Sequence, residues 1–233
     1  EQLAKALFPI GELLKSEVRQ IASEIGLVTA DKKDSQGLCF VGKISLPVFL
    51  QQQLAQKKGN IVEIPDTLPQ FSEYHSLAAT EAHLEQLVQP FTFHESDGIK
   101  VHEHIGAHYY TIGQRKGLHI GGRPNPSFVI GIDTATNTVY TGQEETHPGL
   151  NRIALFISND EINYINSKYI LNTGDSLVCT ARIRYRQPLQ KAILHQFKDG
   201  MYVVFENPQS AITEGQFVAW HLNDEVLGSG VIA

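Results

Sequence analysis

The chain has 233 residues, of which 42% are hydrophobic, and it carries a formal net charge of −6. This length and composition allow one or two domains with buried cores, and the acidic balance excludes a protein that binds nucleic acid through bulk positive charge. No run of 18 apolar residues and no signal peptide occurs, so we expect a cytoplasmic protein with no membrane partner.

The N-terminal part is expected to be helical. A helix is predicted over residues 12–26, because apolar residues recur there at spacings of three and four and Gly26 can end it. A second helix is predicted over residues 44–56. The turn-forming residues 57–60 follow it, and β structure is expected to begin at 61–64.

Residues 65–97 lack a clear strand pattern. They contain one short amphipathic stretch, residues 80–88, which predicts a short helix between Pro69 and Pro90. Long segments of this kind are usually functional or disordered, and the sequence does not choose between these two; the favoured interpretation is a species-specific elaboration without chemistry.

The rest of the chain is β-rich. Strands are predicted at 99–102, 128–133 and 138–141. Short strands then follow from residue 150 to residue 233, which indicates a closed or nearly closed antiparallel barrel. Its expected turns lie at Lys198-Asp199-Gly200, Asn207-Pro208 and Asn223-Asp224.

One of these strands alternates clearly between charged and apolar side chains. Over residues 180–186, alternation places three arginines on one face and the other side chains on the opposite face: Arg182, Arg184 and Arg186 against Ala181, Ile183 and Tyr185. Together with Arg115 and Lys116, these arginines form the local cationic patches through which an acidic protein could still bind RNA.

Two cysteines, Cys39 and Cys179, lie far apart in the sequence, and we expect free thiols rather than a disulfide between them. Cys39 stands in the segment 34–42, Asp-Ser-Gln-Gly-Leu-Cys-Phe-Val-Gly. Residue chemistry alone favours a buried, inert thiol here, although Gly37 also allows a turn that positions the thiol for chemistry. Asp34 and Ser35 are suited to capping that turn.

Four motifs occur together in one order. They are the segment around Cys39, Tyr109-Tyr110-Thr111-Ile112-Gly113-Gln114-Arg115-Lys116-Gly117-Leu118, Arg184-Tyr185-Arg186-Gln187-Pro188 and Thr213-Glu214-Gly215-Gln216. In these motifs the chain resembles the tRNA-specific 2-thiouridylases, and the resemblance runs from Leu7 to Gly230. That family begins with a nucleotide-binding domain carrying an SGGxDSS phosphate loop and a first catalytic cysteine, which this sequence lacks. The resemblance therefore implies a C-terminal portion of such an enzyme, inactive by itself.

The resemblance also implies a fold. The expected class is α+β, mainly β, with a helical remnant of the adenylation domain and the catalytic-cysteine loop in residues 1–40. A small β-rich central domain would follow in residues 41–148, with an insertion relative to the family at about 65–97. A C-terminal antiparallel β-barrel would occupy residues 149–233.

The implied function is the ATP-dependent 2-thiolation of the wobble uridine of tRNA, with magnesium accompanying ATP. Cys39 would be the catalytic residue and carry sulfur as a persulfide, which a second thiol in the missing domain would release by forming a transient disulfide bond. The sulfur donor would be a cysteine desulfurase or a sulfur-relay protein. Cys179 is interpreted as a packed strand residue.

The family's tRNA contacts fall on six residues of this chain: Gln114, Arg115, Lys116, Arg184, Tyr185 and Gln216. The first three lie in a loop whose glycines leave backbone N–H groups free beside two cations, a composition suited to phosphate. The alternative is a non-catalytic RNA-binding module. No metal is expected, because His102, His104 and His108 lack a cysteine or carboxylate that would complete a site.

Overall fold

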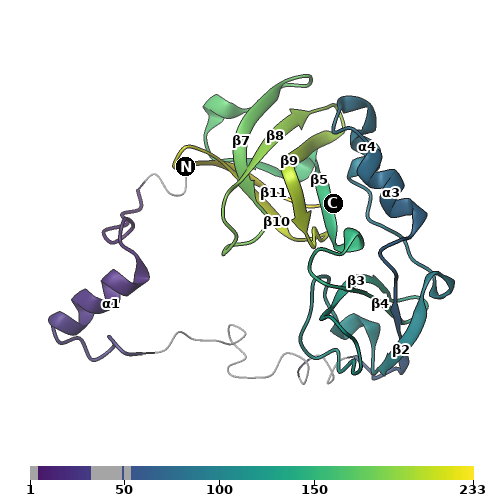
Figure 1. The fold of residues 1–233 in the computed structure, drawn as a ribbon. Coiled ribbons are helices and arrows are strands. Elements are labelled where there is room, and N and C mark those ends of the chain that lie inside the picture. The colour runs from purple at the N-terminus through teal and green to yellow at the C-terminus, as the bar shows by residue number, and fades with distance from the viewer. Residues whose placement is uncertain (1–4, 33–48, 50–53) are drawn as a thin grey trace. The chain divides into compact units, whose positions relative to one another are not determined.

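A computed structural model describes residues 5–32, 49 and 54–233, and its contacts divide the chain into two units, residues 1–53 and 54–233 (Figure 1). In the first unit, helix α1 (Lys15–Glu24) confirms the centre of the helix predicted over 12–26. Its first turn is closed by Glu17, whose Oε2 accepts a 2.6 Å hydrogen bond from the backbone N–H of Leu14. Cys39, Asp34, Ser35 and most of the helix predicted over 44–56 lie outside the described residues.

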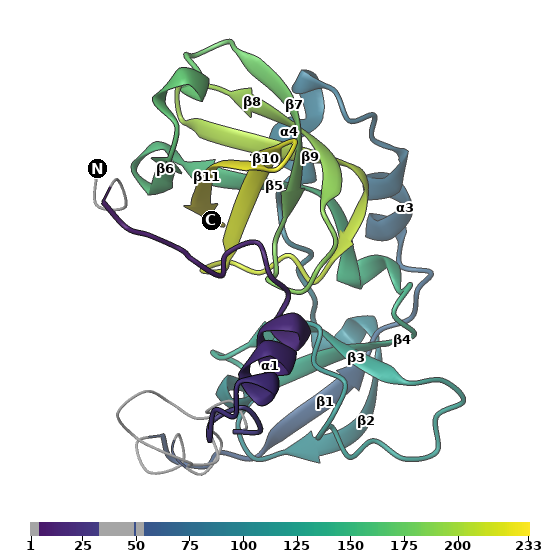
Figure 2. The same cartoon turned by 90° about the vertical axis from the view of Figure 1, so that its left-hand side faces the viewer.

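The second unit begins with a four-stranded sheet. It consists of β1 (Gly59–Glu63), β2 (Ile99–His104), β3 (Ser127–Asp133) and β4 (Thr138–Gln143), in the order β2-β1-β4-β3 (Figure 2). All four strands were predicted within two residues. The central pair, β1 and β4, is parallel, and both are flanked by antiparallel neighbours.

The segment 65–97 contains two helices, α3 (Pro69–Ser76) and α4 (Leu84–Leu87). The 3₁₀ turn Glu81–His83 precedes α4, which places helical structure where the short amphipathic helix was predicted. Tyr74 of α3 joins the segment to β5 (Asn151–Ser158) of the C-terminal sheet, because its hydroxyl donates to Leu87 O at 2.9 Å and accepts from the backbone N–H of Ile153 at 3.0 Å.

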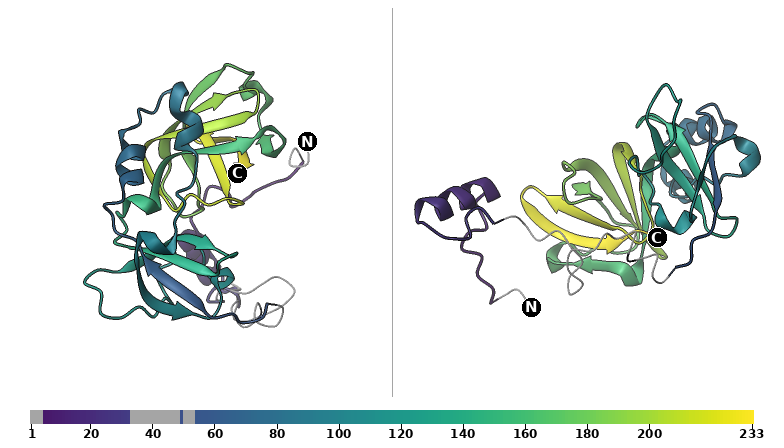
Figure 3. Two further views of the ribbon diagram at one scale, coloured as in Figure 1. Left: turned by 90° about the vertical axis from the view of Figure 1, so that its right-hand side faces the viewer. Right: turned by 90° about the horizontal axis from the view of Figure 1, so that it is seen from below.

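These helices pack against one side of the C-terminal sheet, which residues 151–231 form (Figure 3). Their buried residues share one hydrophobic cluster with residues of that sheet: Tyr74, Leu84, Leu87 and Val88 with Ala154, Tyr202 and Val204. The segment therefore contributes to the core, and whether it is an elaboration without chemistry stays a prediction.

The C-terminal sheet has seven antiparallel strands and curls into a half-barrel. The strands are β5 (Asn151–Ser158), β6 (Ile162–Tyr164), β7 (Ser176–Arg182), β8 (Gln190–Gln196), β9 (Gly200–Ser210), β10 (Phe217–Leu222) and β11 (Glu225–Val231), in the order β5-β9-β8-β7-β10-β11-β6. After β11, the backbone N–H of Ala233 donates to Phe156 O of β5 at 3.0 Å, which brings the end of the chain back to the first strand. Trp220, fully buried, lies in the core of this module.

Short 3₁₀ turns connect the elements, at Glu95–Asp97, Ala107–Tyr109, Pro148–Leu150, Asn159–Glu161 and Ser167–Tyr169. The α+β, mainly β class predicted from the sequence is confirmed. The domain borders expected after residues 40 and 148 stay predictions. None of the described helices is long and apolar enough to cross a membrane.

Two local expectations were wrong. Asn207-Pro208 is no turn between strands but lies inside β9, where the pairing with β5 shifts register between Arg152 and Ala154. The alternation expected over 180–186 also stops early, because β7 ends at Arg182 and a turn follows in which the backbone N–H of Gln187 donates to Arg184 O. Tyr185 consequently lies beyond the end of the strand, with 88% of its surface exposed.

Candidate nucleic-acid interface

A groove in the second unit brings together three segments that are far apart in the sequence. We call it the cationic groove; its volume is about 770 Å³, and it is lined by residues 110–116 and 183–184, by parts of the stretch 211–216, and by Ile132 and Ile232. Five of the six residues predicted to contact tRNA line it: Gln114, Arg115, Lys116, Arg184 and Gln216.

The loop that follows Tyr110 holds its shape through Gln114. The side-chain Oε1 of Gln114 accepts from the backbone N–H of Thr111 at 3.1 Å, and its Nε2 donates to Lys116 O at 2.9 Å. The backbone of Gln114 also pairs with Val129 of β3, whose N–H donates to Gln114 O at 3.0 Å. Both polar atoms of the Gln114 side-chain amide thus form hydrogen bonds within the loop, and these bonds fix the position of the two cations that follow it.

Arg115 and Lys116 are exposed, and no ion pair in the described part of the chain involves either of them. The same holds for Arg184. Cations without a carboxylate partner keep their full charge available for an anion that enters the groove.

Arg184 is tied to the floor of the groove by one contact. Its Nη2 donates to Ala211 O at 3.1 Å, which leaves most of its five N–H donors free. The turn that carries it is held by Gln187, whose Oε1 accepts from the backbone N–H of Ile183 at 3.0 Å and whose Nε2 donates to Gln209 at 2.6 Å. The sequence analysis did not predict a role for Gln187. Its position in the motif Arg184-Tyr185-Arg186-Gln187-Pro188 was the feature that could have indicated one.

Tyr185, the sixth predicted residue, lies in a smaller neighbouring groove of about 360 Å³, which we call the barrel groove. The two grooves share Ile183, Arg184 and Gln216. The barrel groove also contains Arg182 of the predicted cationic patch, and residues that the sequence did not single out: Phe217, Ala219, His221 and Val226. The structure therefore places all six predicted residues in two connected grooves.

Gly113 shapes the cationic groove. It has φ +82°, and a Cβ at this position would lie 2.8 Å from the Cβ of Ala211. Gly117 has a similar φ of +80°, but its nearest neighbour would be Gln114 Nε2 at 3.8 Å. A side chain at either position would therefore strain the backbone, and only at position 113 would it also clash with a neighbouring atom.

This difference predicts the outcome of two matched substitutions. Gly117→Ala should lower the free energy of unfolding by about 1 kcal/mol through the left-handed backbone alone. Gly113→Ala adds a core clash and should cost about 2–4 kcal/mol. Urea unfolding followed by the fluorescence of Trp220, the only tryptophan, measures both. Equal losses in the two variants would contradict the close approach of Gly113 to Ala211.

The one cysteine among the described residues, Cys179, is a free thiol in β7 with 5% of its surface exposed. Burial raises its pKa to about 12, so the thiol stays protonated at neutral pH. No group of three or more His, Cys, Asp or Glu side chains is placed to hold a metal ion in residues 5–32, 49 and 54–233.

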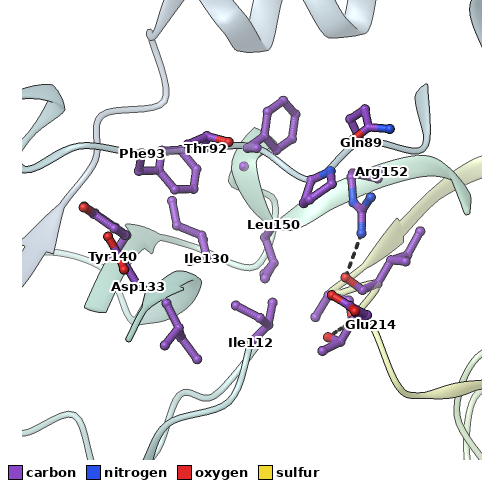
Figure 4. Close-up of a pocket in the computed structure, with 18 of the residues that line it drawn as sticks. Gln89, Thr92, Phe93, Ile112, Ile130, Asp133, Tyr140, Leu150, Arg152 and Glu214 are labelled. Carbon is purple, nitrogen blue, oxygen red and sulfur yellow. Dashed lines mark hydrogen bonds between the residues drawn. The ribbon is translucent and has the colours of Figure 1, made fainter. Parts of the chain in front are cut away.

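An adjoining cavity of about 780 Å³, which shares Ile112 and Ala211 with the cationic groove, lies next to Arg152 (Figure 4). Arg152 is buried, and its guanidinium donates to Val88 O at 2.5 Å and to Ile212 O at 2.9 Å. Burial lowers its pKa, and no carboxylate pairs with it in the described part of the chain. Arg152 thus links the segment after α4 to the stretch that carries the groove residues 211–216.

Three family models match the chain in succession. Residues 1–43 match a tRNA methyl transferase HUP domain, residues 84–143 a tRNA methyl transferase PRC-barrel domain, and residues 157–232 an aminomethyltransferase beta-barrel domain.

Proteins named tRNA-specific 2-thiouridylase MnmA are similar to the chain over its whole length. Identity is 55% over 234 residues with the protein of Flavobacterium johnsoniae, 54% over 234 residues with that of Christiangramia forsetii and 38% over 233 residues with that of Chlamydia trachomatis. The chain spans 59% of the length of the first two relatives and 54% of the third. With three successive domain matches and this identity over its full length, the chain belongs to the family of tRNA-specific 2-thiouridylases.

Proposed function

We propose that this chain is the sulfur-carrying and tRNA-docking part of an enzyme that 2-thiolates the wobble uridine of tRNA in the cytoplasm. The reaction is supported by the similarity of the whole chain to proteins named tRNA-specific 2-thiouridylase. The observation that carries the docking role is the cationic groove, in which Arg115, Lys116 and Arg184 meet without a carboxylate partner in the described part of the chain.

In this proposal Cys39 carries the sulfur. A desulfurase or relay protein would transfer one sulfur atom to the Cys39 thiolate, and the terminal sulfur of the persulfide would then form the bond to C2 of uridine as the activated oxygen leaves. A second thiol would release the sulfur and leave a disulfide with Cys39. Cys179 is unsuited to this role because burial keeps its thiol protonated.

ATP with magnesium would activate the uridine oxygen in the complete reaction. In the family, ATP and magnesium bind at an SGGxDSS loop. This chain does not contain that motif, so in this proposal its residues do not form the ATP site. Their contribution is the sulfur carrier and the surface that positions the tRNA.

An acidic protein needs placed cations to bind RNA. The net charge of −6 repels phosphate at long range, whereas the groove concentrates three cations beside the loop of Gly113 and Gly117. The proposed contacts are phosphates to Arg115, Lys116 and Arg184, with Gln114 positioning the loop and Tyr185 and Gln216 alongside.

The salt dependence of tRNA binding tests this assignment. Each phosphate contact releases counterions from the RNA when the complex forms. A variant that lacks one contact releases fewer of them, so Lys116→Ala and Arg184→Ala should each reduce the slope of log affinity against log salt by about 1. Filter binding of unmodified tRNA over a series of salt concentrations gives the slope.

Lys198→Ala is the matched control, because Lys198 is exposed at the turn between β8 and β9 and lines neither of the two grooves. Its slope should equal that of the wild type. Unchanged affinity and slope in both groove variants would remove the cationic groove from the account.

A further inference from the structure

The barrel groove has two exposed aromatic rings that the proposed phosphate contacts leave unused. Tyr185 is 88% exposed in the turn after β7, and Phe217 is 64% exposed at the start of β10. Neither ring packs against another aromatic ring in the part of the chain that the structure describes. Exposed rings on one groove offer flat apolar faces to a planar ligand.

A polar group without a partner lies in the same groove. His221 of β10 is only 5% exposed, and its Nε2 forms no hydrogen bond with the described residues. Burial, and then the charge of Arg182, lower the pKa of His221, so its ring is neutral at pH 7. A neutral imidazole has one donor and one acceptor, which suits the polar edge of a base.

The charge of the barrel groove is positive. Arg182 and Arg184 line it, and none of its nine lining residues is acidic. The Nη1 of Arg182 donates to Tyr185 O at 3.4 Å, which supports the turn that presents the tyrosine ring. The groove therefore combines an anion-binding rim with aromatic faces.

We propose that the barrel groove binds one unstacked nucleotide of single-stranded RNA, with its base against Tyr185 and Phe217 and its polar edge toward His221. Stacking of single-stranded bases on aromatic side chains beside arginines is the usual mode of such recognition. This proposal rests on the proposed function, because the RNA is the tRNA held by the cationic groove, which shares Arg184 and Gln216 with the barrel groove.

The test measures the binding of unmodified tRNA to the wild type and to variants at several salt concentrations. Phe217→Ala and Tyr185→Ala should each weaken binding about tenfold while the salt slope stays the same, since a stacking contact neutralises no phosphate. Phe217→Tyr should retain the affinity because it keeps a ring. Val178→Ala is the matched control, since Val178 is 72% exposed on β7 and lines neither groove.

Cross-linking gives a direct readout. Ultraviolet irradiation of the complex with tRNA should link RNA to peptides that contain Tyr185 or Phe217, as mass spectrometry would show. Wild-type affinity in both alanine variants, or cross-links confined to other peptides, would overturn the nucleotide site. If Arg184→Ala still reduces the salt slope in that case, the docking role survives; a wild-type chain that binds no tRNA would contradict both.

Discussion

Incubated with a persulfide donor, the chain should gain one sulfur atom, and Cys39→Ser should abolish this gain. Cys179→Ser should take up sulfur like the wild type, because Cys179 is 5% exposed and its pKa is raised to about 12. At neutral pH this thiol stays protonated, and the thiolate is the nucleophile. Intact-mass measurement after removal of the donor shows a gain of one sulfur.

The two serine variants are each other's controls, since they remove chemically identical thiols. Wild-type sulfur uptake by Cys39→Ser would show that Cys39 is not the carrier. A chain that takes up no sulfur but still binds tRNA would instead support the alternative of a non-catalytic RNA-binding module.

Replacing the buried Arg152 should cause a large loss of stability in the second unit. Arg152→Ala removes two charge-assisted hydrogen bonds. It leaves the carbonyl oxygens of two buried residues, Val88 and Ile212, without their donor. We expect a loss of about 3 kcal/mol, since such bonds and the unsatisfied groups that remain are each costly. For a unit of this size that loss lowers the midpoint of thermal unfolding by roughly 6–12 °C.

Lys191→Ala provides the comparison for a surface cation. Its 3.3 Å ion pair with Glu206 is exposed, and removing it should change the stability by less than about 0.5 kcal/mol. Thermal unfolding followed through Trp220 measures both variants. An Arg152→Ala protein as stable as Lys191→Ala would show that the guanidinium does not link Val88 to Ile212.

Much of the fold follows from local patterns. The strands β1 to β4 were found from short apolar runs, and α1 from its spacing of three and four, because burial of one face imposes these periods. The motif residues were also informative, since Arg184 and the loop of Gln114 proved to share one groove.

The failures have physical causes. The strand alternation was extended to Tyr185, but the side chain of Gln187 bonds the backbone of Ile183 and helps close a turn there. Asn207-Pro208 has the composition of a turn, yet in β9 it occupies a register shift that tolerates proline. Phe217 and His221 were missed because their association with Tyr185 depends on the pairing of β10 with β7, which a single sequence does not reveal.

The most direct test of the account is the 2-thiouridine content of tRNA in cells that lack their own 2-thiouridylase and express the full-length protein with this chain. Migration in a gel containing an organomercurial compound separates thiolated from unmodified tRNA. We predict thiolated tRNA with the wild type and with Lys198→Ala, strongly reduced thiolation with Lys116→Ala combined with Arg184→Ala, and none with Cys39→Ser. Wild-type thiolation in the combined groove variant, or in Cys39→Ser, would contradict the account.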